Sequence, residues 1–322
     1  MPTVYHRDDA GAPTYTFSAS ASTNVVHFEG IRTVLKASLV NGYGAKAAAG
    51  WTLVAEDTTY IVLRNGAQTG YVCLSWTATG SGPIAVYLSQ TYTGMSGSVM
   101  TGDGLKTGIA ANNSTPQALQ LNSWCYSSAA QTWTLIADSK TFVLNWVWGG
   151  VPAVTELNSS SPGTYCGLLY VGEDSLGNFI SVGGHLSTSS SPTNYFGNSG
   201  GTALKDPRTG LLVGAGSLPQ MLVMNGSVTQ VRTEVVPLLN TTLARSYWGF
   251  AGGVGGYLRG LALPVDCSAM FPSYGGQSLG SVTLTTRNLN TAINLGDGYT
   301  YFATAHSYLS AFRLMTNNPE FW

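Results

Sequence analysis

Short apolar runs separated by turn-forming residues recur along most of the chain. Five of them are rich in Val, Ile, Tyr, Phe and Trp and are bounded by Gly, Pro, Asn or Ser, which predicts strands at 60–64, 71–76, 84–89, 141–148 and 165–171. A hairpin is predicted over 221–231, because Asn225-Gly226 supplies the positive φ angles of a type I′ turn. The pattern favours an antiparallel β-architecture.

One segment, at about residues 30–41, has helical periodicity instead. Its mainly apolar face carries Ile31, Val34, Leu35, Ser38 and Leu39. Arg32 and Lys36 lie on the other face, and Asn41-Gly42 is expected to end the helix. A second short helix is expected to open at Pro237, with proline at its first position.

A tryptophan-led pattern occurs twice, first over 51–63 and again over 133–144. Trp51 to Glu56 is echoed by Trp133 to Asp138, and in each copy a second strand led by an aromatic residue follows the acidic bend. Each copy predicts a β-hairpin. The carboxylates at the bends (Glu56, Asp57 and Asp138) are expected to accept hydrogen bonds from turn N–H groups.

Ser- and Pro-rich stretches at 158–163 and 187–194 are the candidate linkers or long surface loops. We place a boundary at the first, between an N-terminal β-rich region (1–157), which holds the helix and both hairpins, and a C-terminal β-rich region (158–322). With 322 residues, the chain is long enough for two such regions. The expected fold is mostly β, with antiparallel sandwich-like or barrel-like regions, one short N-terminal helix and few others.

Charged residues make up only 9% of the chain, against about 25% in typical soluble domains. The formal net charge is −1 and no basic run occurs, so we expect no nucleic-acid partner. No apolar stretch approaches the ~20 residues that a bilayer requires, so membrane insertion is not expected either. The first residues lack the layout of a signal peptide. Neutral surfaces of this kind are typical of adhesins, secreted β-proteins and virion components.

The cysteines and histidines show no metal-ligand spacing. Cys73, Cys125, Cys166 and Cys267 lie far apart, and we expect four buried free thiols. His6, His27, His185 and His306 are interpreted as capping or packing residues. No metal and no cofactor are expected.

One motif suggests enzymatic chemistry. Gly197-Asn198-Ser199-Gly200-Gly201 resembles the nucleophile region of trypsin-like serine peptidases, in which the serine lies beside an oxyanion hole. In that fold the histidine base precedes the serine by a long stretch, whereas His185 lies too close before Ser199 and His306 follows it. Catalysis is therefore not expected, and a peptidase using Ser199 is kept as an alternative.

Glycoside hydrolysis would need two facing carboxylates, which sequence cannot pair. The candidates, which we interpret as structural, are Glu29, Glu56, Asp57, Glu156, Glu173, Asp174 and Glu234. The aromatic residues could serve a recognition surface or a core. We assign Trp51, Trp76, Trp133 and Trp146 to the core, and Tyr92, Tyr126, Tyr195 and Tyr274 to the surface.

Several of these segments together resemble a family of tailed-phage and prophage virion proteins. The resemblance is carried by the helix that runs into Gly42-Tyr43-Gly44, the two tryptophan-led hairpins, Gly82 to Leu88, and Tyr257 to Leu261. It implies a virion structural component of the tail, baseplate or fibres, made in the bacterial cytoplasm, present in multiple copies and assembled with other virion proteins and with itself. A role in host attachment, through a surface glycan or pilus, is the associated expectation; a glycan-binding adhesin module is the alternative.

Overall fold

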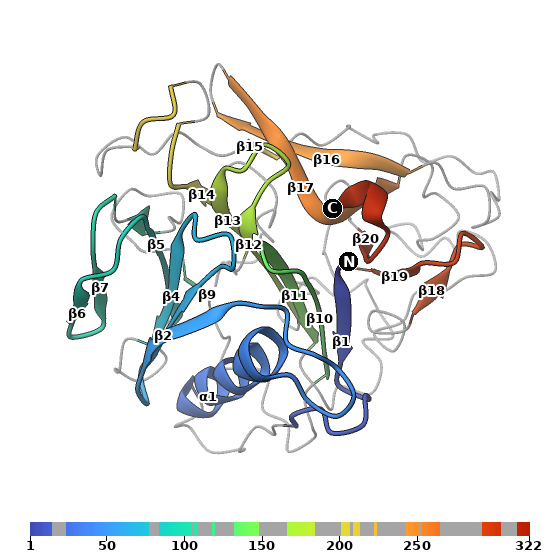
Figure 1. Cartoon of the computed structure of the whole chain (residues 1–322), viewed down its shortest axis with the longest axis horizontal. Helices are drawn as coiled ribbons and strands as arrows, with labels where there is room; N and C mark the ends of the chain where they lie inside the picture. Colours follow the sequence, from blue (N-terminus) through green and yellow to red (C-terminus); the bar gives the residue numbers. More distant parts are fainter. Residues whose placement is uncertain are drawn as a thin grey trace, which may run out of the picture.

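The computed structural model describes residues 1–14, 24–76, 84–104, 106–107, 118–119, 132–147, 166–183, 201–206, 209–212, 222–223, 243–250, 253–264, 292–303 and 314–322. Over these ranges the protein is mostly β, with three antiparallel six-stranded sheets, a two-stranded hairpin and one short α-helix (Figure 1). The expected fold class is confirmed.

The central sheet has the strand order β1-β10-β11-β12-β13-β14. Its strands are β1 (Thr3–His6), β10 (Thr132–Ala137), β11 (Thr141–Val147), β12 (Cys166–Glu173), β13 (Phe179–Gly183) and β14 (Gly201–Ala203). Leu135 and Leu144 point into one core, whereas Ile136 and Val143 point into another. Because side chains alternate between the faces of a strand, burial of both faces explains why the second hairpin reads as an almost continuous apolar run.

The second sheet contains the first tryptophan-led hairpin, formed by β2 (Thr52–Glu56) and β3 (Tyr60–Arg64). It continues through β4 (Tyr71–Trp76) and β5 (Ile84–Ser89), with β8 (Lys106–Thr107) and β9 (Ala118–Leu119) paired to β5. A separate hairpin of β6 (Gly94–Ser96) and β7 (Val99–Thr101) stands beside this sheet. Strands β3, β4 and β5 have the predicted bounds, and β11 and β12 differ from theirs by one or two residues at an end.

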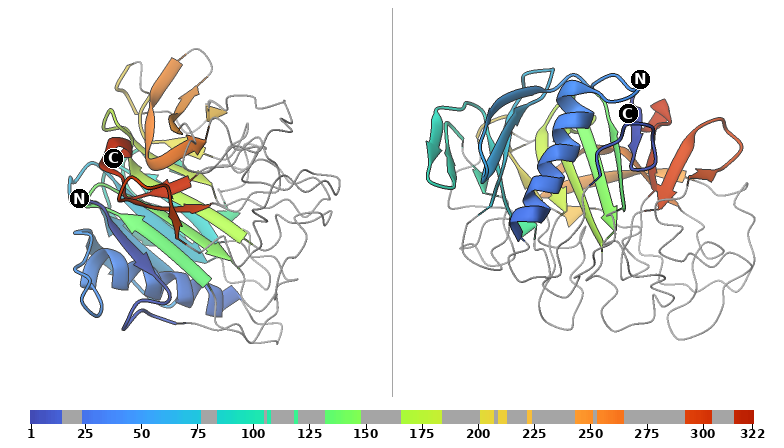
Figure 2. Two further views of the ribbon diagram at one scale, coloured as in Figure 1. Left: turned by 90° about the vertical axis from the view of Figure 1, so that its right-hand side faces the viewer. Right: turned by 90° about the horizontal axis from the view of Figure 1, so that it is seen from below.

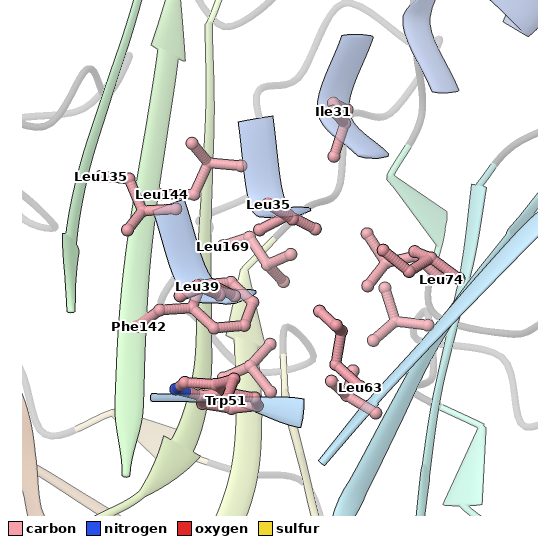
Figure 3. Packing of buried hydrophobic residues seen from close by; sticks show 14 of the residues in the cluster. Ile31, Leu35, Leu39, Trp51, Leu63, Leu74, Leu135, Phe142, Leu144 and Leu169 are labelled. Atoms are coloured by element: carbon pink, nitrogen blue, oxygen red, sulfur yellow. The ribbon is translucent and has the colours of Figure 1, made fainter. Parts of the chain in front are cut away.

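The helix fills the space between these two sheets. It comprises α1 (Asn24–Leu35) and a π-helical turn, η1 (Lys36–Asn41). Ile31, Leu35 and Leu39 are at most 2% exposed and lie between leucines of the central sheet and of the second sheet (Figure 3). The other two predicted positions on this face, Val34 and Ser38, are buried as well.

The two ends of the helix compare differently with the prediction. It begins at Asn24, earlier than the predicted residue 30, because the fully buried Phe28 extends the apolar face by another turn. It ends at Asn41 as predicted. Gly42 has a φ of 75°, and a Cβ there would lie 2.6 Å from the carbonyl oxygen of Lys46, so the stop requires glycine.

The third sheet covers the other face of the central sheet. Its order is β15 (Leu222–Val223), β16 (Leu243–Phe250), β17 (Gly253–Pro264), β20 (Leu314–Thr316), β19 (Thr300–Ala303) and β18 (Ile293–Asn294), and the 3₁₀ turn η5 (Pro319–Phe321) follows. Trp248 and Leu261 pack here against Ile136 and Tyr170 of the central sheet. The views in Figure 2 show the same order of layers, with α1 along the opposite face of the central sheet.

Three further predictions can be compared with the third sheet and the central sheet: the 221–231 hairpin, the second helix and the boundary between the two regions. The Asn225-Gly226 turn lies outside the described residues, and Leu222 and Val223 pair with β16. Residues 237–242 of the second predicted helix are also outside them, and Leu243 begins a strand. The β11–β12 ladder crosses the boundary expected near residue 158, so the two regions share one sheet.

A charged cluster fastens the N-terminal strand to the turn after the helix. One carboxylate oxygen of Asp9 accepts hydrogen bonds from the His6 N–H (2.7 Å), the Tyr43 hydroxyl (2.9 Å) and the Lys46 ammonium (2.7 Å). Burial raises the pKa of Asp9, but these hydrogen bonds outweigh it, and the pKa lies below its usual value. None of the described helices is long and apolar enough to cross a membrane.

Candidate binding surface

The residues proposed for peptidase chemistry fall mainly outside the described ranges. These include Ser199, His185 and His306, so the peptidase alternative remains a prediction. His6 stacks on Phe302, with ring centroids 5.8 Å apart, and its Nδ1 accepts the Asp8 N–H. Among the described residues, no group of three or more His, Cys, Asp or Glu side chains is placed to hold a metal ion.

Cys73 is a buried free thiol in β4, as predicted. Burial raises its pKa, so the reactive thiolate is disfavoured. Cys125 and Cys267, as well as the side chains of Cys166 and His27, lie outside the described part of the structure.

The first three candidate carboxylates lie on or beside the second sheet. Asp57 accepts hydrogen bonds from the N–H groups of Thr59 (2.5 Å) and Tyr60 (3.0 Å), as expected for an acidic bend. Glu56 does not cap this turn; it ends β2 and pairs with Lys36 at 2.5 Å. Glu29 lies on the helix 3.6 Å from Arg32.

The corresponding bend of the second hairpin connects all three sheets. Asp138 caps its own turn by accepting the Lys140 and Thr141 N–H groups, and its other oxygen accepts a 2.6 Å bond from Arg259 in β17. Its carbonyl oxygen accepts the indole N–H of Trp51, next to the second sheet, at 2.9 Å. Two similar bends in the sequence therefore have different roles.

Two further candidate carboxylates, Glu173 and Asp174, are buried at the end of β12. Glu173 accepts the Thr69 hydroxyl (2.8 Å) and lies 3.3 Å from the Lys140 ammonium. Both are fixed by neighbouring donors, as the structural interpretation expects. Glu156 and Glu234 lie outside the described residues.

Asp174, which is 2% exposed, joins the central and third sheets. One of its oxygens accepts the indole N–H of Trp248 (2.7 Å), the backbone N–H of Gly256 (2.8 Å) and the Asn178 amide (2.8 Å). The other oxygen accepts the N–H groups of Leu176 and Asn178 within its own turn. The site needs glycine at 256, because a Cβ there would lie 2.7 Å from the carboxylate.

These anchors leave one face of β16 and β17 turned outward, where the two strands place aromatic and cationic side chains together. Arg245 and Tyr247 are exposed, whereas the intervening Ser246 and the following Trp248 are buried. The Tyr247 and Tyr257 rings meet at 81°, with centroids 6.1 Å apart. The guanidinium of Arg245 lies 4.8 Å from the centroid of the Tyr257 ring. We name Arg245, Tyr247 and Tyr257 the β16–β17 face.

The backbone and the chain terminus hold this face in place. Tyr257 exchanges two hydrogen bonds with Ser175, one from its N–H to the serine hydroxyl (2.9 Å) and one from the Ser175 N–H to its carbonyl (3.1 Å). The Nε and Nη2 atoms of Arg245 donate to the Glu320 carbonyl at 3.3 and 3.1 Å. The Tyr257 hydroxyl also donates to the Trp322 carbonyl at 3.5 Å. A ring and a guanidinium held in this way lose little further freedom on binding a ligand.

The aromatic residues named from sequence divide between core and surface. Trp51 and Trp133 are buried, Trp76 is half-buried against the same core, and the side chain of Trp146 lies outside the described part. Tyr92 is half-buried beside Tyr71; Tyr126, Tyr195 and Tyr274 are outside the described ranges. Sequence analysis did not select the β16–β17 face, because Arg245-Ser246-Tyr247-Trp248 places two polar residues before two aromatic ones. Only their burial in the structure alternates, in the manner of a half-buried strand.

Comparisons of the chain with protein-family models, with curated proteins and with solved structures found no match. The arrangement of the β16–β17 face suits binding, because the exposed Tyr247 ring offers apolar contact and the exposed Arg245 guanidinium offers N–H donors.

Proposed function

We propose that this chain is a structural component of a tailed-bacteriophage virion, associated with the tail, baseplate or fibres and contributing to attachment to the host. It would be present in multiple copies and contact other virion proteins. The resemblance of the helix, the Gly42-Tyr43-Gly44 turn and the tryptophan-led hairpins to virion proteins motivates the proposal.

The observation that carries the proposal is the use of charge in ion pairs that join one part of the fold to another. Ionic pairs fasten one layer or turn to another: Lys36–Glu56 (2.5 Å), Lys46–Asp9 (2.7 Å), Lys140–Glu173 (3.3 Å) and Arg259–Asp138 (2.6 Å). The chain has 14 Lys or Arg and 15 Asp or Glu residues, 9% of its length, and eight of these 29 are used in the four pairs. Interface centres between protein subunits are depleted in charge, so a neutral exterior favours packing against other subunits.

The same pairs support a mechanical role. Each sheet is linked to the next by buried or half-buried polar groups as well as by apolar packing, and breaking such a group away from its partner leaves it unpaired. A component of a particle that must resist force benefits from layers joined in this way.

Quantitative mass spectrometry of purified particles from the bacterium that encodes the chain tests the proposal. Peptides of the chain should appear in a fixed ratio to the major capsid protein, and gold-labelled antibody should mark the tail or its tip. The control is immunoblotting of the same lysate. If the lysate contains the chain and the particles lack it, the virion role is wrong.

A glycan-binding adhesin module is the second candidate, and the β16–β17 face is the observation that favours it. Such a module need not belong to a particle. The two candidates therefore separate on location, whereas the binding chemistry of the face can be examined with the isolated chain.

A further inference from the structure

We propose that the β16–β17 face binds a saccharide that carries a carboxylate group, such as a uronic or other sugar acid of a bacterial surface polysaccharide. The inference rests on the proposed function for the source of the glycan. The recognition itself is argued from the three side chains of the face and their surroundings.

The two tyrosines provide the apolar part of the site. Tyr247 remains 40% exposed although its ring already contacts Tyr257 at 81°, so part of the Tyr247 ring is left open to a ligand. The C–H groups on one face of a pyranose are apolar and carry a small positive charge, and they pack on the electron-rich face of an aromatic ring. The hydroxyl groups of the sugar then project to the sides, where the phenol groups can bond them.

Arg245 selects a carboxylate. Its bond to the Glu320 carbonyl occupies N–H groups of Nε and Nη2, and a guanidinium has five N–H groups in a planar fork. The N–H groups on Nη1 and the second one on Nη2 form the pair that a carboxylate can accept in parallel. The bonded partner of Arg245 is a neutral carbonyl, so this bond leaves the positive charge of Arg245 unneutralised. Arg259, Lys36 and Lys46, in contrast, each pair with a carboxylate.

A second Arg–Tyr pair, in the second sheet, provides a comparison for Arg245 and Tyr257. Arg64 lies 5.0 Å from the centroid of the Tyr71 ring in the second sheet. Arg64 and Tyr71 are both half-buried, and the Nε of Arg64 is enclosed. Tyr71 and Tyr257 are both half-buried, whereas Arg64 is half-buried and Arg245 is exposed. The two pairs therefore differ in the exposure of the arginine, which makes the Arg64 pair a matched control.

The test uses the full chain on an array of carboxylated glycans (galacturonic, glucuronic, sialic and 3-deoxy-octulosonic acid types), each beside its methyl ester. Calorimetry on the best probe then compares four proteins: the parent, Arg245→Gln, Tyr247→Ala and Arg64→Gln. We expect binding to free acids, at least tenfold weaker binding to their esters, and at least tenfold weaker binding by the Arg245 and Tyr247 variants. Arg64→Gln should bind as the parent does.

Three results of the glycan experiments would overturn the inference. They are no binding of any carboxylated glycan by the folded parent, equal affinity for acid and ester, and unchanged affinity of both β16–β17 variants. Tighter binding of an oligoglutamate peptide than of every glycan would assign the face to a protein partner and overturn it as well. Circular dichroism establishes that each variant is folded. Presence or absence of the chain in particles does not alter these outcomes, so this inference and the virion role can fail separately.

Discussion

The buried carboxylate of Asp174 offers the most direct test of how the sheets are joined. Replacing it with alanine removes the acceptor for five hydrogen bonds. The donors differ in whether water can take the place of the carboxylate. The N–H groups of Leu176 and Asn178 lie in a turn at the surface, where water can bond them. The indole N–H of Trp248 and the N–H of Gly256 are buried between sheets.

The expected cost follows from these two buried donors. A buried donor left without an acceptor costs about 1–3 kcal/mol, so Asp174→Ala should lower the free energy of unfolding by about 2–6 kcal/mol. Since a typical domain has about 5–15 kcal/mol in total, the change should be plain in urea denaturation followed by tryptophan fluorescence. Asp174→Asn retains one oxygen acceptor, so it should cost less than alanine.

Asp57→Ala is the matched control, since Asp57 also caps a bend after a strand but is exposed and is bonded within its own turn. It should cost clearly less than Asp174→Ala. In a Trp248→Phe background, which lacks the indole donor, Asp174→Ala should cost about 1–3 kcal/mol less than in the parent. Equal costs for Asp57→Ala and Asp174→Ala would refute the reasoning.

Three further changes test other contacts. Burial raises the pKa of Asp9, but its hydrogen bonds lower it more, so the stability that Asp9 contributes above about pH 4 should be lost as the pH falls. Asp9→Asn should therefore reduce the fall of the urea midpoint at acid pH, and an unchanged fall would contradict this prediction. Burial raises the pKa of Tyr5 to about 12, against about 10 in the unfolded chain, so the stability that Tyr5 contributes below about pH 10 should decline toward pH 12. Tyr5→Phe should reduce that decline of the urea midpoint. Gly260→Ala (φ 72°) puts Cβ 2.4 Å from Trp322, whereas Gly210→Ala (φ 68°) has no atom within 4 Å, so thermal denaturation should show a larger loss for Gly260→Ala; equal losses would mean that Trp322 moves aside.

Local features of the chain could be predicted because their causes lie within a few residues. The bounds of β3, β4 and β5 follow from apolar runs between turn residues, and the end of the helix follows from Gly42. The helix start was missed although Phe28 lies three residues before Ile31, at helical spacing. The structure shows that Phe28 packs into the shared core and so belongs to the apolar face.

The sequence by itself determined that the chain forms hairpins with acidic bends and carries few charged residues. Only the tertiary structure decided that Asp57 stays at the surface while Asp138 meets Arg259, a residue 121 positions away. The outward position of Arg245 and Tyr247 was decided in the same way. Alternation along β16 defines two faces, but which face is buried depends on which one packs against the central sheet, and that choice is made by contacts between distant strands.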